Sequence, residues 1–189
     1  MVFALRRRIF LRKIRGRPRV APTEGVEPLE QPTRKKNRLE SYDYSQNGAY
    51  FITICTKDRK CILSTIVGAT LGRQACTHLT NAGRIVEQAI FRIPKSYQDV
   101  RLEKYVIMPN HIHLLLMIDT LHGRPRVAPT VSRIVQQTKG LATKLIGYHV
   151  FQKSFHDRII RNDAEYDMIW EYIDTNPARW QQDCFYTEE

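Results

Sequence analysis

YVIMPNHIHLLLMI, residues 105–118, is the most apolar run of a 189-residue chain that is otherwise polar and basic. The pair Pro109-Asn110 in its middle is typical of a turn, so the run predicts a hairpin of two strands, 101–108 and 111–118. The second strand is apolar apart from two histidines, which indicates that it is buried. The other elements are expected to pack around this hairpin.

The two histidines of this run are separated by a single residue. Because side chains on a strand alternate between faces, His111 and His113 point to one face, and Ile112, Leu114 and Leu116 point to the other, which forms the core. Two imidazoles side by side on a buried strand are costly without a partner, and neutral imidazole is a common ligand of divalent metals. The spacing alone leaves two interpretations open: a metal site, or two histidines bonded to backbone groups or water.

The remaining elements follow from apolar periodicity and from turn and capping signals. Strands are predicted at 48–56, at 61–63 and within 150–160, and helices at 81–93, at 131–148 and from 163 to about 175. This order predicts an α/β (α+β) fold, a ferredoxin-like split β-α-β sandwich with an antiparallel sheet and helices packed mainly on one face.

Positive charge is concentrated at the N-terminus. Residues 1–38 hold twelve Lys or Arg and three Glu, a net +9 out of +11 for the whole chain. Together with several prolines, this composition predicts a basic, disordered arm, which either adds affinity for a polyanion or is simply solvated. We predict a single domain over 39–182 and a short tail over 183–189.

No apolar run reaches the roughly 18 residues of a membrane helix, so no membrane contact is expected. The cysteines lack any spacing typical of a zinc site and are expected to be reduced thiols of a cytoplasmic protein; they are Cys55, Cys61, Cys76 and Cys184.

An octapeptide, Gly-Arg-Pro-Arg-Val-Ala-Pro-Thr, occurs at 16–23 and again at 123–130. A related segment, Val-Gly-Ala-Thr-Leu-Gly-Arg, occupies 67–73. Codons for Val-Gly-Ala-Thr can be the reverse complement of codons for Val-Ala-Pro-Thr. We therefore interpret all three segments as translated copies of a short palindromic DNA repeat inserted in frame; a shared linker peptide or a local duplication is the alternative.

The last predicted helix presents a phenol and an amide together. At 100° per residue, Tyr166, Ile169 and Ile173 cover its core-facing side, while Tyr172 lies at the margin and Asn176 follows one turn later. By themselves these two residues also fit a tyrosine at a helix edge and an asparagine that caps a helix end.

Taken together, these motifs resemble a known family. Met108-Pro109-Asn110-His111-Ile112-His113 before an apolar strand is similar to the HUH motif of the IS200-like single-tyrosine transposases. Tyr172-Ile173-Asp174-Thr175-Asn176-Pro177 resembles their tyrosine helix. The similarity is closest to the REP-associated tyrosine transposases and extends over roughly residues 37–180.

This resemblance implies a metal-dependent enzyme that nicks and joins single-stranded DNA. It implies that Tyr172 is the nucleophile, which forms a 5′-phosphotyrosine intermediate, and that His111, His113 and Asn176 hold Mg²⁺ or Mn²⁺. The expected partner is single-stranded DNA from a hairpin-forming repeat, bound by a monomer or a homodimer. The alternative function is that of a degenerate copy that only binds nucleic acid.

Further residues are candidates for contacts with DNA or for the nucleophile. Arg158 and Arg161 precede the tyrosine helix and are expected to contact phosphates, and Gln136 and Lys139 on the preceding helix are weaker candidates. A solvated charge run explains the arginines equally well. Tyr166 is a rival nucleophile, but its core-facing position favours a packing role.

Overall fold

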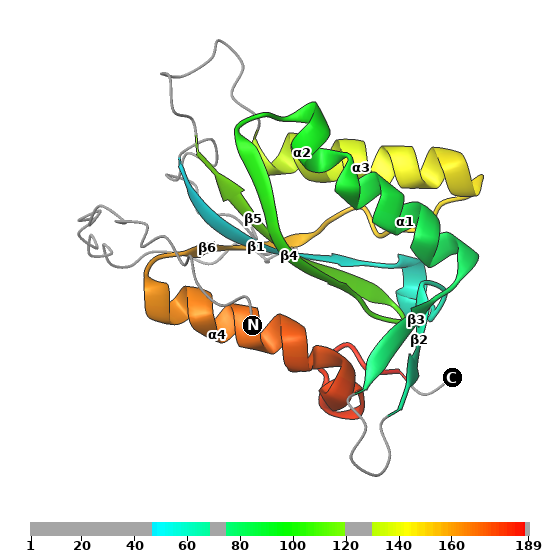
Figure 1. Ribbon diagram of the computed structural model, residues 1–189. Helices are drawn as coiled ribbons and strands as arrows, with labels where there is room; N and C mark the ends of the chain where they lie inside the picture. The colour runs from blue at the N-terminus through cyan, green and yellow to red at the C-terminus, as the bar shows by residue number, and fades with distance from the viewer. Residues whose placement is uncertain (1–46, 69–74, 120–129, 188–189) are drawn as a thin grey trace, which may run out of the picture.

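The structure, a computed structural model, describes residues 47–68, 75–119 and 130–187. Its centre is a four-stranded antiparallel sheet in the order β4-β5-β1-β6 (Figure 1). The strands are β1 (Gly48–Cys55), β4 (Val100–Ile107), β5 (His111–Ile118) and β6 (His156–Ile160). β5 lies between two partners and is buried at every residue, as its apolar sequence predicts.

Helices cover both faces of this sheet. α1 (Asn81–Phe91), the short α2 (Ile93–Ser96) and α3 (Val131–Ile146) lie on one face, and α4 (Asp163–Thr175) lies on the other (Figure 1). Each face has its own hydrophobic cluster, and the α1/α3 cluster contains Ile112, Leu114 and Leu116. The predicted fold class and the direction of these three side chains are thus confirmed, and the tyrosine helix occupies the second face.

Three helices begin at capping residues. The side chains of Thr80, Thr130 and Asn162 accept hydrogen bonds from the backbone N–H groups of Gly83, Arg133 and Glu165 at the starts of α1, α3 and α4. Each bond satisfies an N–H group that has no partner inside the helix. The start of the last helix at Asn162-Asp163 was predicted for this reason and is confirmed.

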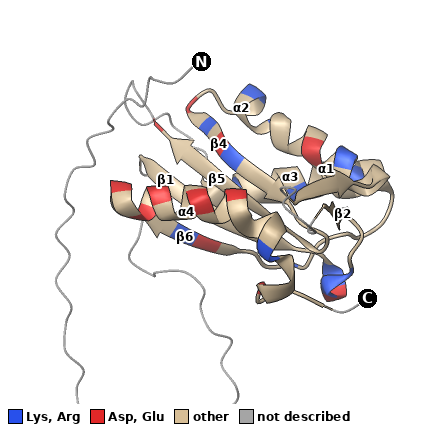
Figure 2. Cartoon of the chain, turned by 60° about the horizontal axis from the view of Figure 1, so that its bottom comes forward, with Lys and Arg blue, Asp and Glu red and all other residues tan. Residues whose placement is uncertain are grey.

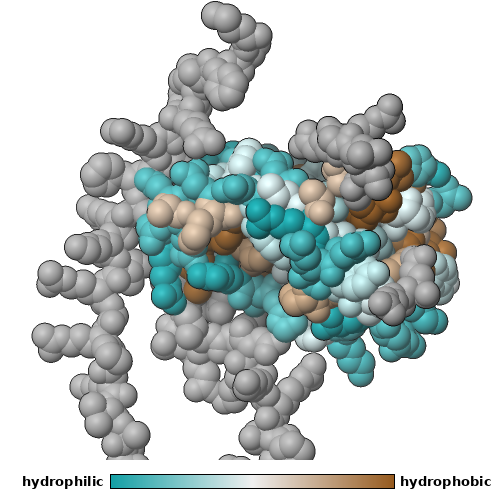
Figure 3. Space-filling model, turned by 90° about the horizontal axis from the view of Figure 1, so that it is seen from below, coloured by the Kyte–Doolittle hydropathy of each residue, from teal (hydrophilic) through white to brown (hydrophobic). Residues whose placement is uncertain are grey.

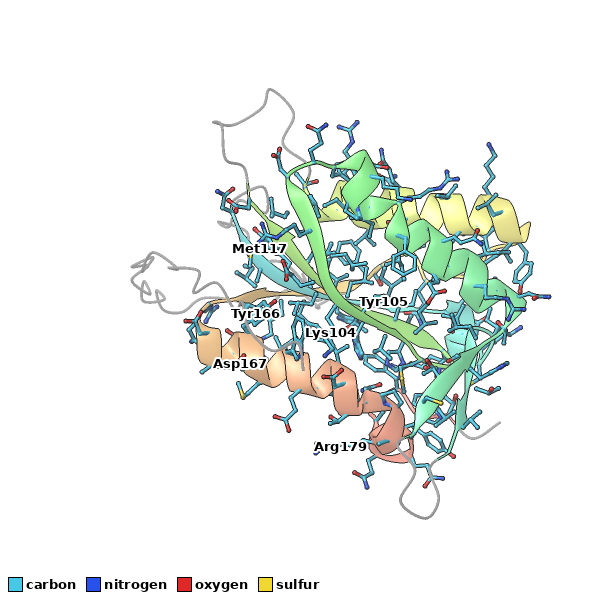
Figure 4. The ribbon with its side chains drawn as sticks, in the orientation of Figure 1. Lys104, Tyr105, Met117, Tyr166, Asp167 and Arg179 are labelled. Carbon is cyan, nitrogen blue, oxygen red and sulfur yellow. The ribbon has the colours of Figure 1, made fainter. Side chains whose placement is uncertain are left out.

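Alternation along β4 sets the position of α4. Figure 4 shows that Lys104 points toward α4, whereas Tyr105 points to the opposite face. Lys104 Nζ lies 4.1 Å from the centroid of the Trp170 ring and forms an ion pair with Asp174. Tyr105 donates a hydrogen bond of 2.8 Å to Glu87 on α1. Adjacent residues of one strand therefore hold helices on both faces.

Two segments differ from the prediction. Cys61–Leu63 is not a strand; the chain forms a separate hairpin of β2 (Ser64–Val67) and β3 (Cys76–Leu79), which was missed. Its strands are too short for a clear alternation of apolar residues. After α4 the chain does not simply end its helix at Asn176 but turns into a 3₁₀ segment, η2 (Asn176–Gln182), with Pro177 near its start.

Several predictions concern residues outside the described ranges. They are the disordered arm at 1–38, the octapeptide at 16–23, most of its second copy at 123–130 and most of the related segment at 67–73. Within the described ranges, no helix has the length and apolar character needed to cross a membrane.

Candidate metal and nucleophile site

The His pair lies at the first residues of β5, on the face that α4 covers. The Nε2 atoms of His111 and His113 are 3.1 Å apart, so the two rings do share a face, as their spacing predicts. The two residues are 0% and 1% exposed. Register places His113 opposite Thr53 and His111 opposite Cys55 on β1.

The other ring nitrogens have partners that fix the orientation of both rings. Asn110 Nδ2 donates to the carbonyl of Phe185, which leaves Asn110 Oδ1 to accept from His111 Nδ1 at 2.9 Å. The Nε2 atom of a neutral His111 therefore carries a lone pair. His113 Nδ1 lies 2.9 Å from Thr53 Oγ1, and a hydroxyl can donate or accept. His113 Nε2 can therefore carry the proton and donate it to His111, or it can carry a lone pair that binds a cation.

Three further side chains reach the pair from the end of α4 and from beyond it. The hydroxyl of Tyr172 is 3.3 Å from His113 Nε2 and 3.2 Å from Asp183 Oδ2. Asn176 Nδ2 donates to the same carboxylate oxygen at 2.8 Å. Phenol, amide, carboxylate and imidazoles therefore converge within one chain.

These donors fit a divalent metal. One ligand atom from each of His111, His113 and Asp183 lies within 4.8 Å of the others. Asn176 Oδ1 is buried and has no hydrogen-bond partner among the described residues, although buried amide oxygens are normally paired. Neighbouring ligands around an octahedral ion at about 2.1 Å lie about 3.0 Å apart, close to the separation of the two Nε2 atoms.

Burial governs the protonation of the site. It lowers the pKa of His111 to about 4, against an opposing effect of the Asp183 charge, and it lowers the pKa of His113 well below 6.5, with His111 adding to the shift. The pKa of Tyr172 is raised, first by burial and then by the Asp183 charge. At neutral pH the imidazoles are therefore neutral, which metal binding requires, and the phenol keeps its proton.

We expect the protein without metal to lose stability as the pH falls. An unfolded histidine titrates near 6.5 and folded His111 near 4, so the unfolded chain binds more protons between these values. The contribution of His111 to the free energy of unfolding is fully present above about pH 6.5. It decreases as the pH is lowered, and about 1–2 kcal/mol of it is lost at pH 5. Urea unfolding in EDTA at pH 7 and at pH 5 measures this loss of free energy of unfolding. A His111→Asn variant should lose less; an equal loss would contradict the assignment.

The C-terminal residues cover the His pair. The ring of Phe185 lies 4.7 Å from that of His111, and the guanidinium of Arg59 lies over the Phe185 ring at 4.8 Å from its centroid. Trp180 of η2 is 5.9 Å from the His111 ring and also lines a cleft of about 630 Å³ between η2 and β2. The cleft thus shares a wall with the site, although the His pair itself is buried.

The alternative tyrosine is engaged elsewhere. The Tyr166 hydroxyl donates to Glu103 on β4 at 3.4 Å, and burial with this carboxylate raises the pKa of Tyr166 to about 12. Figure 4 shows Tyr166 at the interface between α4 and β4, one of several side chains that dock the helix. A packing role agrees with this position.

The proposed DNA contacts are spread over the molecule. Arg158 forms an ion pair of 2.6 Å with Glu165, whose other oxygen accepts from the backbone N–H of Arg161. Gln136 and Lys139 lie on α3, on the face away from the His pair. Lys139 donates to backbone carbonyls of residues 152–154. The structure does not bring these four residues together with the His pair.

Sequence reasoning missed Asp183 and Phe185. Both lie in the segment 183–189 that was predicted to be a tail, and the backbone carbonyl of Phe185 accepts a hydrogen bond from Asn110, which directly precedes β5. A sequence signal existed: Asp183 and the aromatic residues Trp180, Phe185 and Tyr186 make this end of the chain unlike a solvated tail. Their target could not be inferred because it depends on how η2 and the residues after it pack, which no local pattern determines.

No family model matches this chain. Among solved structures, a REP-associated tyrosine transposase bound to a REP hairpin is similar with a TM-score of 0.55 and 19% identity, over 75% of this chain and 73% of that one. A protein from Deinococcus radiodurans R1 has a TM-score of 0.43 and 16% identity, over 73% and 95% of the two chains, which is too weak to support a conclusion.

The fold is therefore similar to that of a REP-associated tyrosine transposase, as the resemblance seen in the sequence predicts. The chain belongs to one family with an uncharacterized protein of Haemophilus influenzae (strain Rd). The two are 30% identical over 175 residues, which cover 82% of this chain and 94% of that protein.

Proposed function

We propose that this protein is a DNA transposase that nicks and joins single-stranded DNA through Tyr172. One observation carries the proposal: the Tyr172 hydroxyl lies 3.3 Å from His113 Nε2 and 3.2 Å from Asp183, in the same chain. A nucleophile beside a cluster of metal-type ligands is what phosphoryl transfer requires. The solved protein of the same fold binds a REP hairpin, so hairpin-forming DNA is the proposed substrate.

The reaction follows from the positions of these groups. Tyr172 Oη attacks the phosphorus of a phosphodiester, the bond to the 3′ oxygen breaks, and the 5′ end remains attached as a phosphotyrosine. The Tyr172 hydroxyl, which donates to Asp183 Oδ2 at 3.2 Å, releases its proton to solvent as it attacks, and the leaving 3′ oxygen takes up a proton from solvent. Attack by a 3′-hydroxyl on the phosphotyrosine reverses these steps and joins two ends without an external energy source.

We propose that His111, His113, Asp183 and Asn176 hold Mg²⁺ or Mn²⁺, with Asn176 Oδ1, which has no partner in the described part of the chain, as one donor. When bound, the cation neutralises charge on the phosphate oxygens and offsets the Asp183 charge that raises the pKa of Tyr172. Thr53 and Asn110 orient the two imidazoles through their Nδ1 atoms, as partners of metal-bound histidines do.

Charge indicates the side from which DNA approaches. Within Asp163–Thr175, α4 carries five acidic residues and no basic one, which Figure 2 shows as red bands along the helix. Phosphates are repelled from this surface. The face seen from below in Figure 3 is mostly hydrophilic, with separate hydrophobic patches. We propose that DNA enters instead along the cleft beside Trp180, where Arg179, Gln181 and Gln182 line the wall.

Covalent capture of DNA tests the function. We expect the protein, incubated with Mn²⁺ and a library of hairpin-bearing single strands, to form an adduct that survives denaturing electrophoresis. Tyr172→Phe should form none, because the attacking oxygen is gone. Tyr166→Phe, on the same helix, is the matched control and should keep the adduct.

An adduct that persists in Tyr172→Phe would reject Tyr172 as the nucleophile. Binding of the library without any adduct in the wild-type protein would favour the second candidate, a copy that binds nucleic acid without chemistry. That candidate is the weaker one, because a binding protein has no need of a tyrosine aimed at a buried His pair.

A further inference from the structure

The three related segments at 16–23, 67–73 and 123–130 have no part in the proposed chemistry, yet their relation is closer than the peptides suggest. With arginine encoded as CGN, the strand complementary to Gly-Arg-Pro-Arg-Val-Ala-Pro-Thr encodes Val-Gly-Ala-Thr-Arg-Gly-Arg in one frame, whatever the third bases are. The chain has this sequence at 67–73 with Leu71 as the one difference, and CGN becomes CTN by a single base change.

The segments lie at three different places in the chain. One is near the N-terminus, one joins β2 to β3, and one joins β5 to α3. A peptide that bound a partner would recur as the same peptide, whereas 67–73 repeats only the complementary strand. What the three segments share is therefore a DNA element, present twice in one orientation and once in the other.

The fold explains why the coding sequence tolerates the internal copies. Val67 at the end of β2 pairs with Cys76 of β3, so the residues between them join two strands that are already paired. Asp119 follows β5, and Thr130, the last residue of the octapeptide, supplies the cap of α3. Closure entropy grows slowly with loop length, so added residues at these two junctions leave the sheet and the core intact.

We propose that this DNA element is a ligand of the protein, recognised as a folded single strand. Where the arginines are encoded as CGN and the third bases match, codons 67–73 are complementary to sequence within codons 16–23 and 123–130 except at Leu71, and one strand of the gene can then form a stem. The Gly-Arg-Pro codons, GGN-CGN-CC, are also self-complementary when their two variable bases pair. The assignment rests on the proposed function, since joining of single strands is the class of reaction that would insert such copies.

Binding to oligonucleotides from the gene itself tests this proposal. The full-length protein in EDTA is titrated, by fluorescence anisotropy, with a hairpin whose arms are the native codons 67–73 and 123–130. One control hairpin uses synonymous codons with pairing kept, and another has pairing lost. We expect the native hairpin to bind at least about 10-fold more tightly than the first control, because base contacts add to backbone contacts.

Equal affinity for the native and the recoded stems would overturn the proposal, and so would AGA or AGG codons for the arginines of the octapeptide. The outcome is separable from that of the proposed function. Selective binding of the native stem without a covalent adduct in Mn²⁺ would support the proposed ligand and reject the proposed nicking reaction. A Tyr172 adduct with another hairpin, but no preference for the native stem, would reject the ligand alone.

Discussion

His113→Ala should abolish the stabilisation of this protein by Mn²⁺. A ligand that binds only the folded state stabilises it by about 2.7 kcal/mol at 100 times its dissociation constant. His113 Nε2 faces His111 Nε2 at 3.1 Å, and removal of one of two imidazole ligands should weaken metal binding by at least about 100-fold. The measurement is thermal unfolding of each variant in Mn²⁺ and in EDTA. The difference between the two melting temperatures of one variant cancels the effect of the substitution on the metal-free fold.

The chain offers matched variants for this experiment. His149→Ala changes an exposed histidine outside the cluster and should keep the full Mn²⁺ effect. Asp183→Asn tests the carboxylate that the sequence did not reveal, and we expect a partial loss. Full stabilisation of His113→Ala by Mn²⁺ would show that the metal binds elsewhere.

Leu114→Ala should cost about 2–5 kcal/mol in the free energy of unfolding. Leu114 is fully buried in β5 and faces the cluster beneath α1 and α3, pairing with Ile52 on β1 and Tyr105 on β4. Its removal leaves a cavity between rigid elements that cannot close around it. Urea unfolding at pH 7 measures the loss.

Met168→Ala is the matched control for this substitution. Met168 lies on α4 and its side chain is 63% exposed, so the change should stay within about 0.5 kcal/mol. Similar losses for the two variants would mean that β5 is not the centre of the core.

The fold could be predicted largely because its signals are local. The Pro109-Asn110 turn and the apolar run after it identify the central hairpin, and the caps at Thr80 and Asn162 locate two helices. The β2–β3 hairpin could not be predicted because each of its strands has four residues, too few for a pattern. That α4 lies on the face opposite α1 and α3 depends on contacts such as Lys104 with Trp170, between residues far apart in the chain.

For the site, the sequence by itself determined that His111 and His113 share a face, because alternation along a strand is a property of the backbone. It likewise determined that Tyr172 and Asn176 are one helical turn apart. Only the tertiary structure decided that these two pairs meet, and that Asp183 and Phe185 join them. The physical reason is range: periodicity fixes directions within one element, whereas packing between elements determines where the residues after η2 meet the start of β5.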